Sequence, residues 1–269
     1  MTRLLHPELS YKVRGVLLDV YNALGPVLKE AYYRDAIVIG LEKLGIACVP
    51  EKRFEVYYEG ERVGLYDVDV WVEGGKMLLE LKVAPAIEPI HKAQAISYLK
   101  VTDADLAIVV NYGGASLQDE RLPNFLRGRQ PDFSWHPQSV DRDVLYPELV
   151  NTIQQACHHV HFTLGPGFLH QVYRRAAMIE LRRSGLSYDY IKQVPVTYAN
   201  QLLGYQEVRL IHVENKILLA TFALGGTDNT RTLVLVEQLK SHLRRTGSRL
   251  GLLANFYGTR LAITPVRIK

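Results

Sequence analysis

Hydrophobic residues recur at three- and four-residue steps over residues 13–24, and this spacing predicts an amphipathic helix. Gly25-Pro26 breaks the pattern, and a second helical pattern then runs to about Leu44. The same pair of patterns returns over about 148–160 and 168–181, again with a glycine and a proline between them. The chain is therefore predicted to contain two similar pairs of helices.

The first pair of helices is followed by the shorter patterns that are typical of strands. Hydrophobic residues over 54–58, 63–72 and 77–83 predict three strands separated by turns. A helix is predicted over about 90–100, and the apolar run 106–111 is typical of a strand buried on both faces. The order α-α-β-β-β-α-β predicts an α/β fold, with a mixed central sheet between layers of helices.

The two halves of the chain also share individual residues at an offset of 140 positions. Leu24-Gly25-Pro26 followed by Tyr33 recurs as Leu164-Gly165-Pro166 followed by Tyr173. After a shift of four residues the match resumes, and Gln94, Leu99, Thr102, Leu106 and Asn111 correspond to Gln238, Leu243, Thr246, Leu250 and Asn255. Such self-similarity indicates a tandem duplication of one structural unit.

The duplication predicts how the chain is divided into domains. We expect a first domain over 1–126, a polar linker over 127–143 and a second domain over 144–269. The two domains are expected to pack as an internal pseudo-dimer. This arrangement favours a monomer, although the sequence leaves a homodimer open.

The composition is that of an ordinary soluble globular protein, with 48% hydrophobic and 22% charged residues among 269. No apolar run approaches the about 20 residues of a membrane span, and the N-terminus lacks the apolar segment of a signal peptide. Cys48 and Cys157 occupy non-equivalent places in the repeats, so they do not predict a disulfide. These features favour the cytoplasm and argue against a membrane partner.

Charge is distributed unevenly between the two halves. Residues 1–126 contain 14 basic and 18 acidic residues, whereas residues 127–269 contain 18 basic and 10 acidic residues. This asymmetry is expected if one half binds metal ions and the other binds a polyanion. Solvated faces without a partner explain the charges equally well.

Strand alternation decides which polar side chains share a face of the predicted sheet. One face receives Asp67, Asp69 and Trp71, and the other receives Tyr66, Val68, Val70 and Val72. On the next strand Glu80 and Lys82 share a face, and a short Gly-Gly turn brings them close to Asp69. Two carboxylates with access to water are ligands that suit Mg²⁺. The alternative interpretation of these three residues is a set of ion pairs on the protein surface.

The two copies differ where this chemistry would lie. At the 140-residue offset, Glu30, Asp69, Glu80 and Lys82 correspond to His170, Arg209, Ala220 and Phe222. The differing positions therefore indicate a site that only the first copy has kept. Residues kept in both copies, such as Tyr33 and Tyr173 or Gln94 and Gln238, are interpreted mainly as structural.

The order of these residues resembles a known family of nucleases. Asp69 followed by Glu80-Leu81-Lys82 resembles the D…(D/E)xK signature of the restriction-endonuclease-like nuclease superfamily, also written PD-(D/E)xK. The segment from Gln94 to Tyr98 resembles the QxxxY motif of RecB-like and lambda-exonuclease-like members. The resemblance covers nearly all of residues 9–126 and, in eroded form, residues 144–266.

Within this superfamily, the segments 25–33, 63–69 and 91–94 together look like the GxxExxY protein family. The sequence departs from that pattern at two positions. Val27 stands where the first glycine of the family motif would stand, and Asp67 stands where arginine is more usual.

The resemblance implies a tandem of restriction-endonuclease-like units with one metal site. The implied metal-binding groups are Asp69, Glu80, the backbone carbonyl of Leu81, and Glu30 on the preceding helix. Lys82 is implied to activate the attacking water, and Gln94 and Tyr98 to contact metal-bound water or a phosphate. The implied activity is Mg²⁺- or Mn²⁺-dependent hydrolysis of the phosphodiester bonds of nucleic acid, with DNA favoured over RNA.

The second copy carries basic residues in place of the site. We expect it to hold the phosphate backbone without cleaving it, through Arg174, Arg175, Arg182, Arg183, Arg244, Arg245 and Arg249. Its histidines, including His158, His159 and His161, have no accompanying cysteine pair, so a zinc site is disfavoured. Two other functions stay open: a nucleic-acid-binding or regulatory protein that no longer cleaves, and a scaffold that binds neither metal nor nucleic acid.

Overall fold

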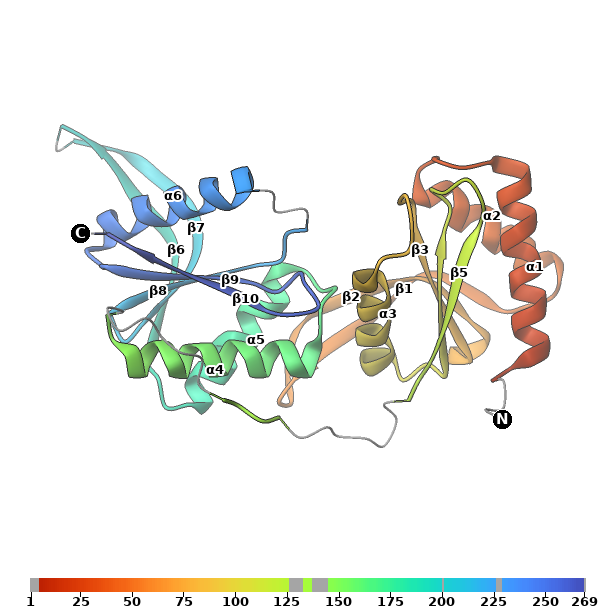
Figure 1. The fold of residues 1–269 in the computed structure, drawn as a ribbon, viewed down its shortest axis with the longest axis horizontal. Coiled ribbons are helices and arrows are strands. Elements are labelled where there is room, and N and C mark those ends of the chain that lie inside the picture. Colours follow the sequence, from red (N-terminus) through yellow and green to blue (C-terminus); the bar gives the residue numbers. More distant parts are fainter. Residues whose placement is uncertain (1–4, 126–132, 137–144, 200, 226–228, 269) are drawn as a thin grey trace. The chain divides into compact units, whose positions relative to one another are not determined.

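The computed structural model describes residues 5–125, 133–136, 145–199, 201–225 and 229–268 (Figure 1). Contacts divide the chain into two compact units. Unit 1 comprises residues 1–57 and 64–131, and unit 2 comprises residues 58–63 and 132–269, each as far as it is described. Most of the predicted linker over 127–143 lies outside the described residues, and residues 133–136 have no regular secondary structure.

Unit 1 begins with two helices, as the hydrophobic periodicity predicted. α1 (Pro7–Leu24) starts earlier than the apolar pattern because Pro7 and Glu8 are well suited to a first turn: proline fixes φ, and the carboxylate faces the positive end of the helix. α1 ends at Gly25, where φ is 68° and glycine is favoured. α2 (Glu30–Lys43) follows after a short loop.

The sheet of unit 1 has the strand order β1-β2-β3-β4-β5. Its strands are β1 (Cys48–Tyr58), β2 (Glu61–Val72), β3 (Met77–Lys82), β4 (Leu106–Asn111) and β5 (Gln118–Pro123). A short 3-10 helix, η1 (Glu73–Gly75), joins β2 to β3, and the helix α3 (Pro89–Thr102) joins β3 to β4. β3 and β4 run parallel, whereas β2 with β3 and β4 with β5 are antiparallel, so the sheet is mixed.

The fifth strand is absent from the sequence-based prediction. The segment Gln118–Pro123 has no hydrophobic alternation, and all six of its residues are half-buried. It lies at the edge of the sheet, where only one side of the strand is paired. The side chains of an edge strand need not follow the alternation that identifies a buried strand, so the pattern gave no signal.

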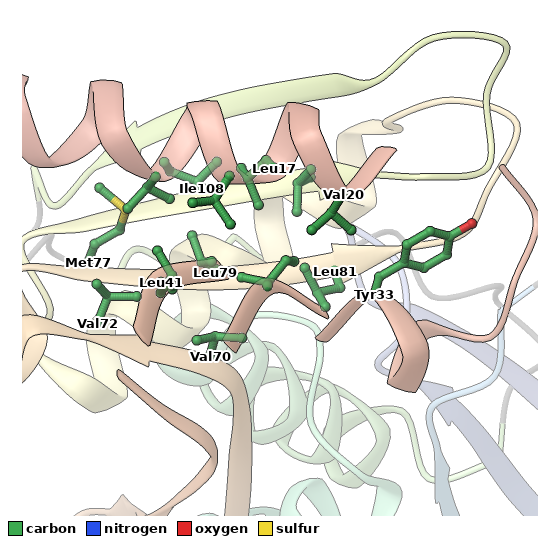
Figure 2. Close-up of a cluster of buried hydrophobic side chains, with 14 of the residues drawn as sticks. Leu17, Val20, Tyr33, Leu41, Val70, Val72, Met77, Leu79, Leu81 and Ile108 are labelled. Atoms are coloured by element: carbon green, nitrogen blue, oxygen red, sulfur yellow. The ribbon is translucent and has the colours of Figure 1, made fainter. Parts of the chain in front are cut away.

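The core of unit 1 lies between the first two helices and the sheet (Figure 2). Side chains from α1, α2, β2, β3 and β4 meet there, among them Leu17, Val20, Tyr33, Leu41, Val70, Val72, Met77, Leu79, Leu81 and Ile108. α3 packs against β4 and β5. Because strand residues alternate between faces, the core positions of β3 leave Glu80 and Lys82 on the opposite face.

Unit 2 repeats this architecture. Its elements are α4 (Pro147–Leu164), α5 (His170–Arg183), β6 (Tyr188–Tyr198), β7 (Gln201–Val213), β8 (Ile217–Phe222), α6 (Asn229–Thr246), β9 (Leu250–Asn255) and β10 (Ala262–Arg267). The strand order is again sequential, and β8 and β9 are the parallel pair. The two five-stranded mixed sheets with flanking helices confirm the predicted α/β class and the duplication. The internal pseudo-dimer stays a prediction.

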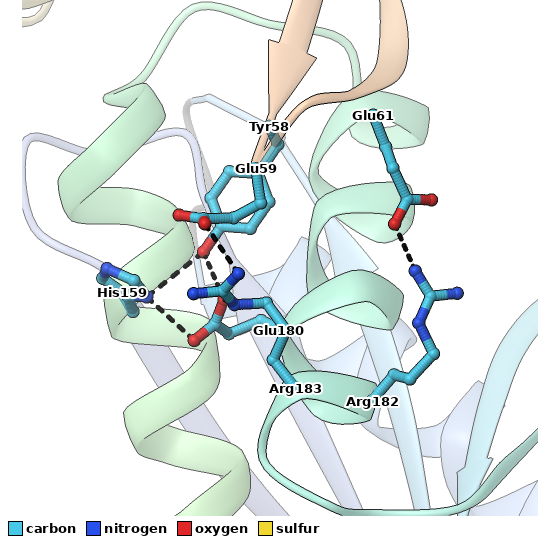
Figure 3. Close-up of polar contacts among 7 residues, drawn as sticks. All are labelled: Tyr58, Glu59, Glu61, His159, Glu180, Arg182 and Arg183. Atoms are coloured by element: carbon cyan, nitrogen blue, oxygen red, sulfur yellow. Dashed lines mark hydrogen bonds and ion pairs between the residues drawn. The ribbon is translucent and has the colours of Figure 1, made fainter.

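Unit 2 includes residues 58–63, which contain the turn of the β1–β2 hairpin (Figure 3). The hydroxyl of Tyr58 donates a hydrogen bond of 2.8 Å to Oε2 of Glu180. Glu59 pairs with Arg183 at 2.7 Å, and Glu61 pairs with Arg182. Two arginines expected to bind nucleic acid therefore already have carboxylate partners within this unit.

Two further sequence-based expectations concern absences. No helix in the described ranges is both long and apolar enough to cross a membrane. Cys48 and Cys157 are both free cysteines, as expected from their non-equivalent positions.

Candidate active site

The pairing of β2 with β3 brings the candidate acids together. Val70 lies opposite Leu79 in this antiparallel pair, so Asp69 and Glu80 occupy the next positions of the two strands. Asp69 Oδ2 accepts a hydrogen bond of 2.7 Å from the backbone N–H of Leu81. The side chain of Leu81 is in the core, so only its backbone groups can serve the site.

Glu80 is the most deeply buried acid of this group, with 4% of the residue exposed. Its Oε1 lies 2.7 Å from Nζ of Lys82, and its Oε2 accepts a hydrogen bond of 2.9 Å from the hydroxyl of Tyr66. Both oxygens therefore have a donor, as a buried carboxylate requires.

Asp69 is less well compensated. Burial raises its pKa to about 7, and the negative charge of Glu80 adds to this effect. The Leu81 N–H and the Lys82 ammonium oppose the rise without cancelling it. An excess of negative charge in a buried place is what a divalent cation would relieve.

Lys82 is held in its charged form. Desolvation is the largest single effect on its pKa and lowers it, but Glu80, Glu30 and Asp69 together raise the pKa above the ordinary value. The side chain is therefore an ammonium that donates hydrogen bonds near neutral pH.

Glu30, at the start of α2, shares the electrostatic field of the site. Burial raises its pKa, the charge of Lys82 lowers it and Asp69 raises it, and the backbone N–H of Val83 also stabilises its ionised form. Within the described residues, no three side chains of histidine, cysteine, aspartate or glutamate are gathered closely enough to hold a metal ion. Glu30 is therefore near the site, but it does not form a three-residue metal-binding cluster with Asp69 and Glu80.

The donor set nevertheless suits a hard divalent cation. Mg²⁺ and Mn²⁺ prefer oxygen ligands and, for Mg²⁺ especially, retain several waters, so two carboxylates and a carbonyl suffice as protein ligands. Asp69 and Glu80 supply the carboxylates from adjacent strands, and burial together with the charge of Glu80 raises the pKa of Asp69. The residues present therefore fit such an ion.

α3 supports the site from the face of the sheet on which Glu80 lies. Tyr98 is 3% exposed, and its ring stacks on that of Tyr66 with a centroid distance of 3.8 Å and an interplanar angle of 20°. Gln94 lies one turn earlier and is half-buried. Of the two supporting residues, the structure thus connects Tyr98 to the site through Tyr66.

Tyr66 is a residue that strand alternation missed. Strand alternation predicted that Tyr66 and Asp69 lie on different faces of the sheet. The Tyr66 hydroxyl donates to Glu80, which lies on the Asp69 side, so this prediction is wrong. The pairing of β2 with β3 covers only residues 70–72, so the earlier part of β2 is not held in register with β3. A break in regular pairing lets two residues three positions apart approach the same neighbour.

Two charged residues near the motif also differ from simple expectation. Asp67 forms a two-pronged pair with Arg53 at 2.7 and 2.9 Å, which lowers the pKa of its carboxyl, so it is not part of the site. Arg34, which the sequence analysis did not single out, lowers the pKa of Asp69 by its charge. It lies one helical turn after Glu30 and pairs with Glu51 at 2.7 Å.

The loop before Glu30 has a conformation at residue 27 that favours glycine. Val27 has a φ of 71°, a conformation that is unfavourable for a β-branched residue, whereas Gly167 occupies the equivalent place in unit 2. The Tyr33 hydroxyl donates to the carbonyl of Gly25 and accepts from the N–H of Leu28. Tyr173 makes the same bonds in unit 2, so the interpretation of both tyrosines as structural is confirmed.

The equivalent place in unit 2 has no acid pair. Ala220 and Phe222 stand on β8 where β3 has Glu80 and Lys82, and the strand register places Leu210 opposite Ala220. The 140-residue offset had instead paired Arg209 with Asp69. β7 is one residue longer than β2, which shifts the correspondence by one position.

The seven arginines expected to bind nucleic acid do not share one environment. Arg182 and Arg183 are paired with acids, and Arg175 donates to the carbonyl of Val63. Arg244, Arg245 and Arg249 are exposed on or near α6, whereas Arg174 is buried. Arg244, Arg245 and Arg249 are therefore three exposed arginines close together in the sequence, at and just after the end of α6.

Comparisons with known proteins agree with the duplicated fold. A family model described as the PD-(D/E)XK nuclease superfamily matches residues 7–122 and again residues 147–266. No curated protein matches the chain. One solved structure, titled "Crystal structure of SSO0001", is 16% identical over 43% of this chain and 77% of that chain, with a TM-score of 0.24.

Proposed function

The chain belongs to the PD-(D/E)XK nuclease superfamily, and on this basis we propose that unit 1 is a divalent-metal-dependent nuclease. The site consists of Asp69, Glu80 and Lys82, with Glu30 close by. We further propose the GxxExxY family within the superfamily, a catalytic domain over 1–126, a linker over 127–143 and a non-catalytic domain over 144–269. DNA is the favoured substrate.

The observation that carries the proposal is the arrangement of three charged groups on β2 and β3. Asp69 and Glu80 are neighbours across the strand pair, and Lys82 lies 2.7 Å from Glu80. Unit 2 has the same fold and none of these groups, so the fold does not need them. Buried charge that a fold does not need is expected where it serves chemistry.

The roles of the residues follow from their charges and contacts. Asp69, Glu80 and the carbonyl of Leu81 would hold Mg²⁺ or Mn²⁺, which, when bound, supplies a Lewis acid that stabilises negative charge on the phosphoryl group. Lys82 is protonated, so it would donate a hydrogen bond that orients the attacking water and would offset the phosphate charge. Tyr66 would fix the position of Glu80.

Unit 2 is proposed to bind the strand without cleaving it. The exposed arginines on and near α6 (Arg244, Arg245 and Arg249) are suited to the phosphate backbone, to which binding depends on salt and little on sequence. One site per chain cuts one strand, so a double-strand break would require two chains or two events.

The test is cleavage of single- and double-stranded DNA and RNA in Mg²⁺, Mn²⁺ or EDTA. We expect cleavage that requires the metal and is lost in Asp69→Asn. Asp67→Asn is the matched control, because Asp67 is paired with Arg53 away from the site. Binding without cleavage of any substrate would instead support the non-catalytic binder.

A further inference from the structure

Arg174 on α5 is a buried cation without an acidic partner. The residue is 8% exposed, and its guanidinium lies 5.6 Å from the centre of the Tyr190 ring. It forms no ion pair with a carboxylate in the part of unit 2 that the structure describes. A buried charge of this kind is costly unless something compensates it.

The two copies differ in the charges around this arginine. Arg34 is its equivalent in unit 1 and has two acidic partners, Glu51 at 2.7 Å and Asp35 at 3.4 Å. At the same positions unit 2 has Ile191 and Arg175. The two copies therefore share the arginine, which in unit 2 is more buried and has neither of these acids beside it.

The neighbours of Arg174 are also basic. Burial lowers the pKa of Arg174, Tyr190 raises it, and the charges of Arg209 and Arg175 lower it further. Burial and then the charge of Arg174 lower the pKa of His170. Lys192 lies 5.8 Å from the same Tyr190 ring, on the side of β6. Arg174, Lys192 and Arg209 therefore lie around one place between α5, β6 and β7, where Arg209 also pairs with Glu207 at 3.2 Å.

We propose that this place in unit 2 is a binding site for a phosphate group, with Arg174 as its central ligand and Arg209 and Lys192 beside it. A guanidinium can donate two parallel hydrogen bonds to a phosphate, and a cluster of cations favours an anion that carries more than one charge. The choice of phosphate rests on the proposed nucleic-acid function. The phosphate can come from a nucleic-acid strand or from a free nucleotide.

The first experiment measures thermal unfolding of the full chain in EDTA, in potassium phosphate and in potassium chloride of equal ionic strength. Phosphate should raise the unfolding midpoint of the wild type by a few degrees, because a ligand that binds only the folded state stabilises it. The rise should be lost in Arg174→Gln and kept in Arg260→Gln, an exposed arginine of the same unit. An equal rise in Arg174→Gln, or no rise in the wild type, would overturn the proposal.

The unliganded stability of the variant separates binding from folding. Arg174→Gln removes a buried charge that has no acidic partner, so without phosphate its unfolding midpoint should equal or exceed that of the wild type. If Arg174→Gln does not fold, Arg209→Gln is tested in its place, because the Arg209 side chain is 43% exposed. In Arg209→Gln, phosphate should raise the unfolding midpoint by less than in the wild type. An unchanged rise in Arg209→Gln would overturn the assignment of this place.

The source of the phosphate is then identified by calorimetry in EDTA. A mononucleotide and a 5′-phosphorylated oligonucleotide are compared, and Arg174→Gln should weaken whichever binds by at least about tenfold. Because EDTA prevents metal-dependent cleavage, failure here leaves the proposed nuclease untouched. Conversely, an inactive unit 1 leaves this binding measurable.

Discussion

Nζ of Lys82 lies 2.7 Å from Oε1 of Glu80, and the two residues are two positions apart on the same strand. Alternation along β3 places the two side chains on one face while Leu79 and Leu81 enter the core on the other. The regular alternation of β3 therefore brings Glu80 and Lys82 together. The pairing of β2 with β3 places both of them beside Asp69.

Replacing Lys82 with methionine should lower the rate of cleavage by about 10²- to 10⁴-fold, the usual contribution of a residue that positions or transfers a proton. It should also destabilise the fold, because Glu80 would stay buried without its cation. Adding Glu80→Gln should restore stability but not cleavage. Wild-type cleavage by Lys82→Met would contradict the assigned role.

The stability of the metal-free protein should depend on pH through Asp69. The pKa of this group is about 7 in the folded protein and has an ordinary value of 3.8, so folding favours its protonated form. Its contribution to stability is complete below pH 3.8 and is lost as the pH rises through about 7. In EDTA, wild-type stability should therefore fall relative to that of Asp69→Asn across this window, by at most about 1.4 kcal/mol per pH unit.

Denaturant unfolding at several pH values measures this difference directly. If the difference in unfolding free energy between the wild type and Asp69→Asn stays constant from pH 4 to pH 7, folding does not raise the pKa of Asp69. Metal affinity provides the complementary measurement: Mn²⁺ competes with the proton, so its binding should tighten over the same window.

Removing the Tyr66 hydroxyl should loosen Glu80 without unfolding the sheet. Tyr66→Phe keeps the ring stacked on Tyr98 but deprives a buried carboxylate oxygen of its donor, at a cost of about 1–2 kcal/mol in unfolding free energy. Cleavage should slow as well, because the position of Glu80 is less restricted. Tyr57→Phe is a control, since that tyrosine is exposed. Equal stability and activity in both variants would contradict the role of Tyr66.

Val27 gives a prediction about strain in the loop before α2. Val27→Gly should stabilise the protein by about 1 kcal/mol, because a left-handed conformation is costly for any residue with a Cβ and the valine side chain is 72% exposed. The reverse change at the equivalent position, Gly167→Val, should destabilise unit 2. Thermal unfolding of the two variants measures both changes in stability. A lower unfolding midpoint in Val27→Gly would contradict the claim that Val27 is strained.

Periodicity predicted the parts of the fold whose side chains face a core. The helices α1 and α2 and the strand Leu106–Asn111 could be recognised because each buries a regular pattern of apolar residues. The edge strand β5 could not, because its six half-buried, mostly polar residues carry no such pattern.

The acids and Lys82 of the candidate site were predicted because strand alternation places them close together and the second copy lacks them. Tyr66 could not be placed correctly, since alternation assumes a regular strand and the pairing of β2 with β3 stops at Val70. The match of Asp69 with Arg209 failed for a similar reason: one extra residue in β7 moves Leu210 into the place opposite Ala220. A constant sequence offset cannot detect such a local change in register.

The most direct test of the account is Mn²⁺ binding and DNA cleavage measured together on the full chain, as wild type and as Glu80→Gln. This variant keeps the size and shape of the side chain, removes its charge and replaces one acceptor oxygen with an NH2 donor. We predict that the wild type binds Mn²⁺ and cleaves, and that Glu80→Gln weakens Mn²⁺ binding and loses cleavage while Glu73→Gln, an acid outside the site, changes neither. Cleavage by Glu80→Gln at the wild-type rate would contradict the assignment of the active site to β2 and β3.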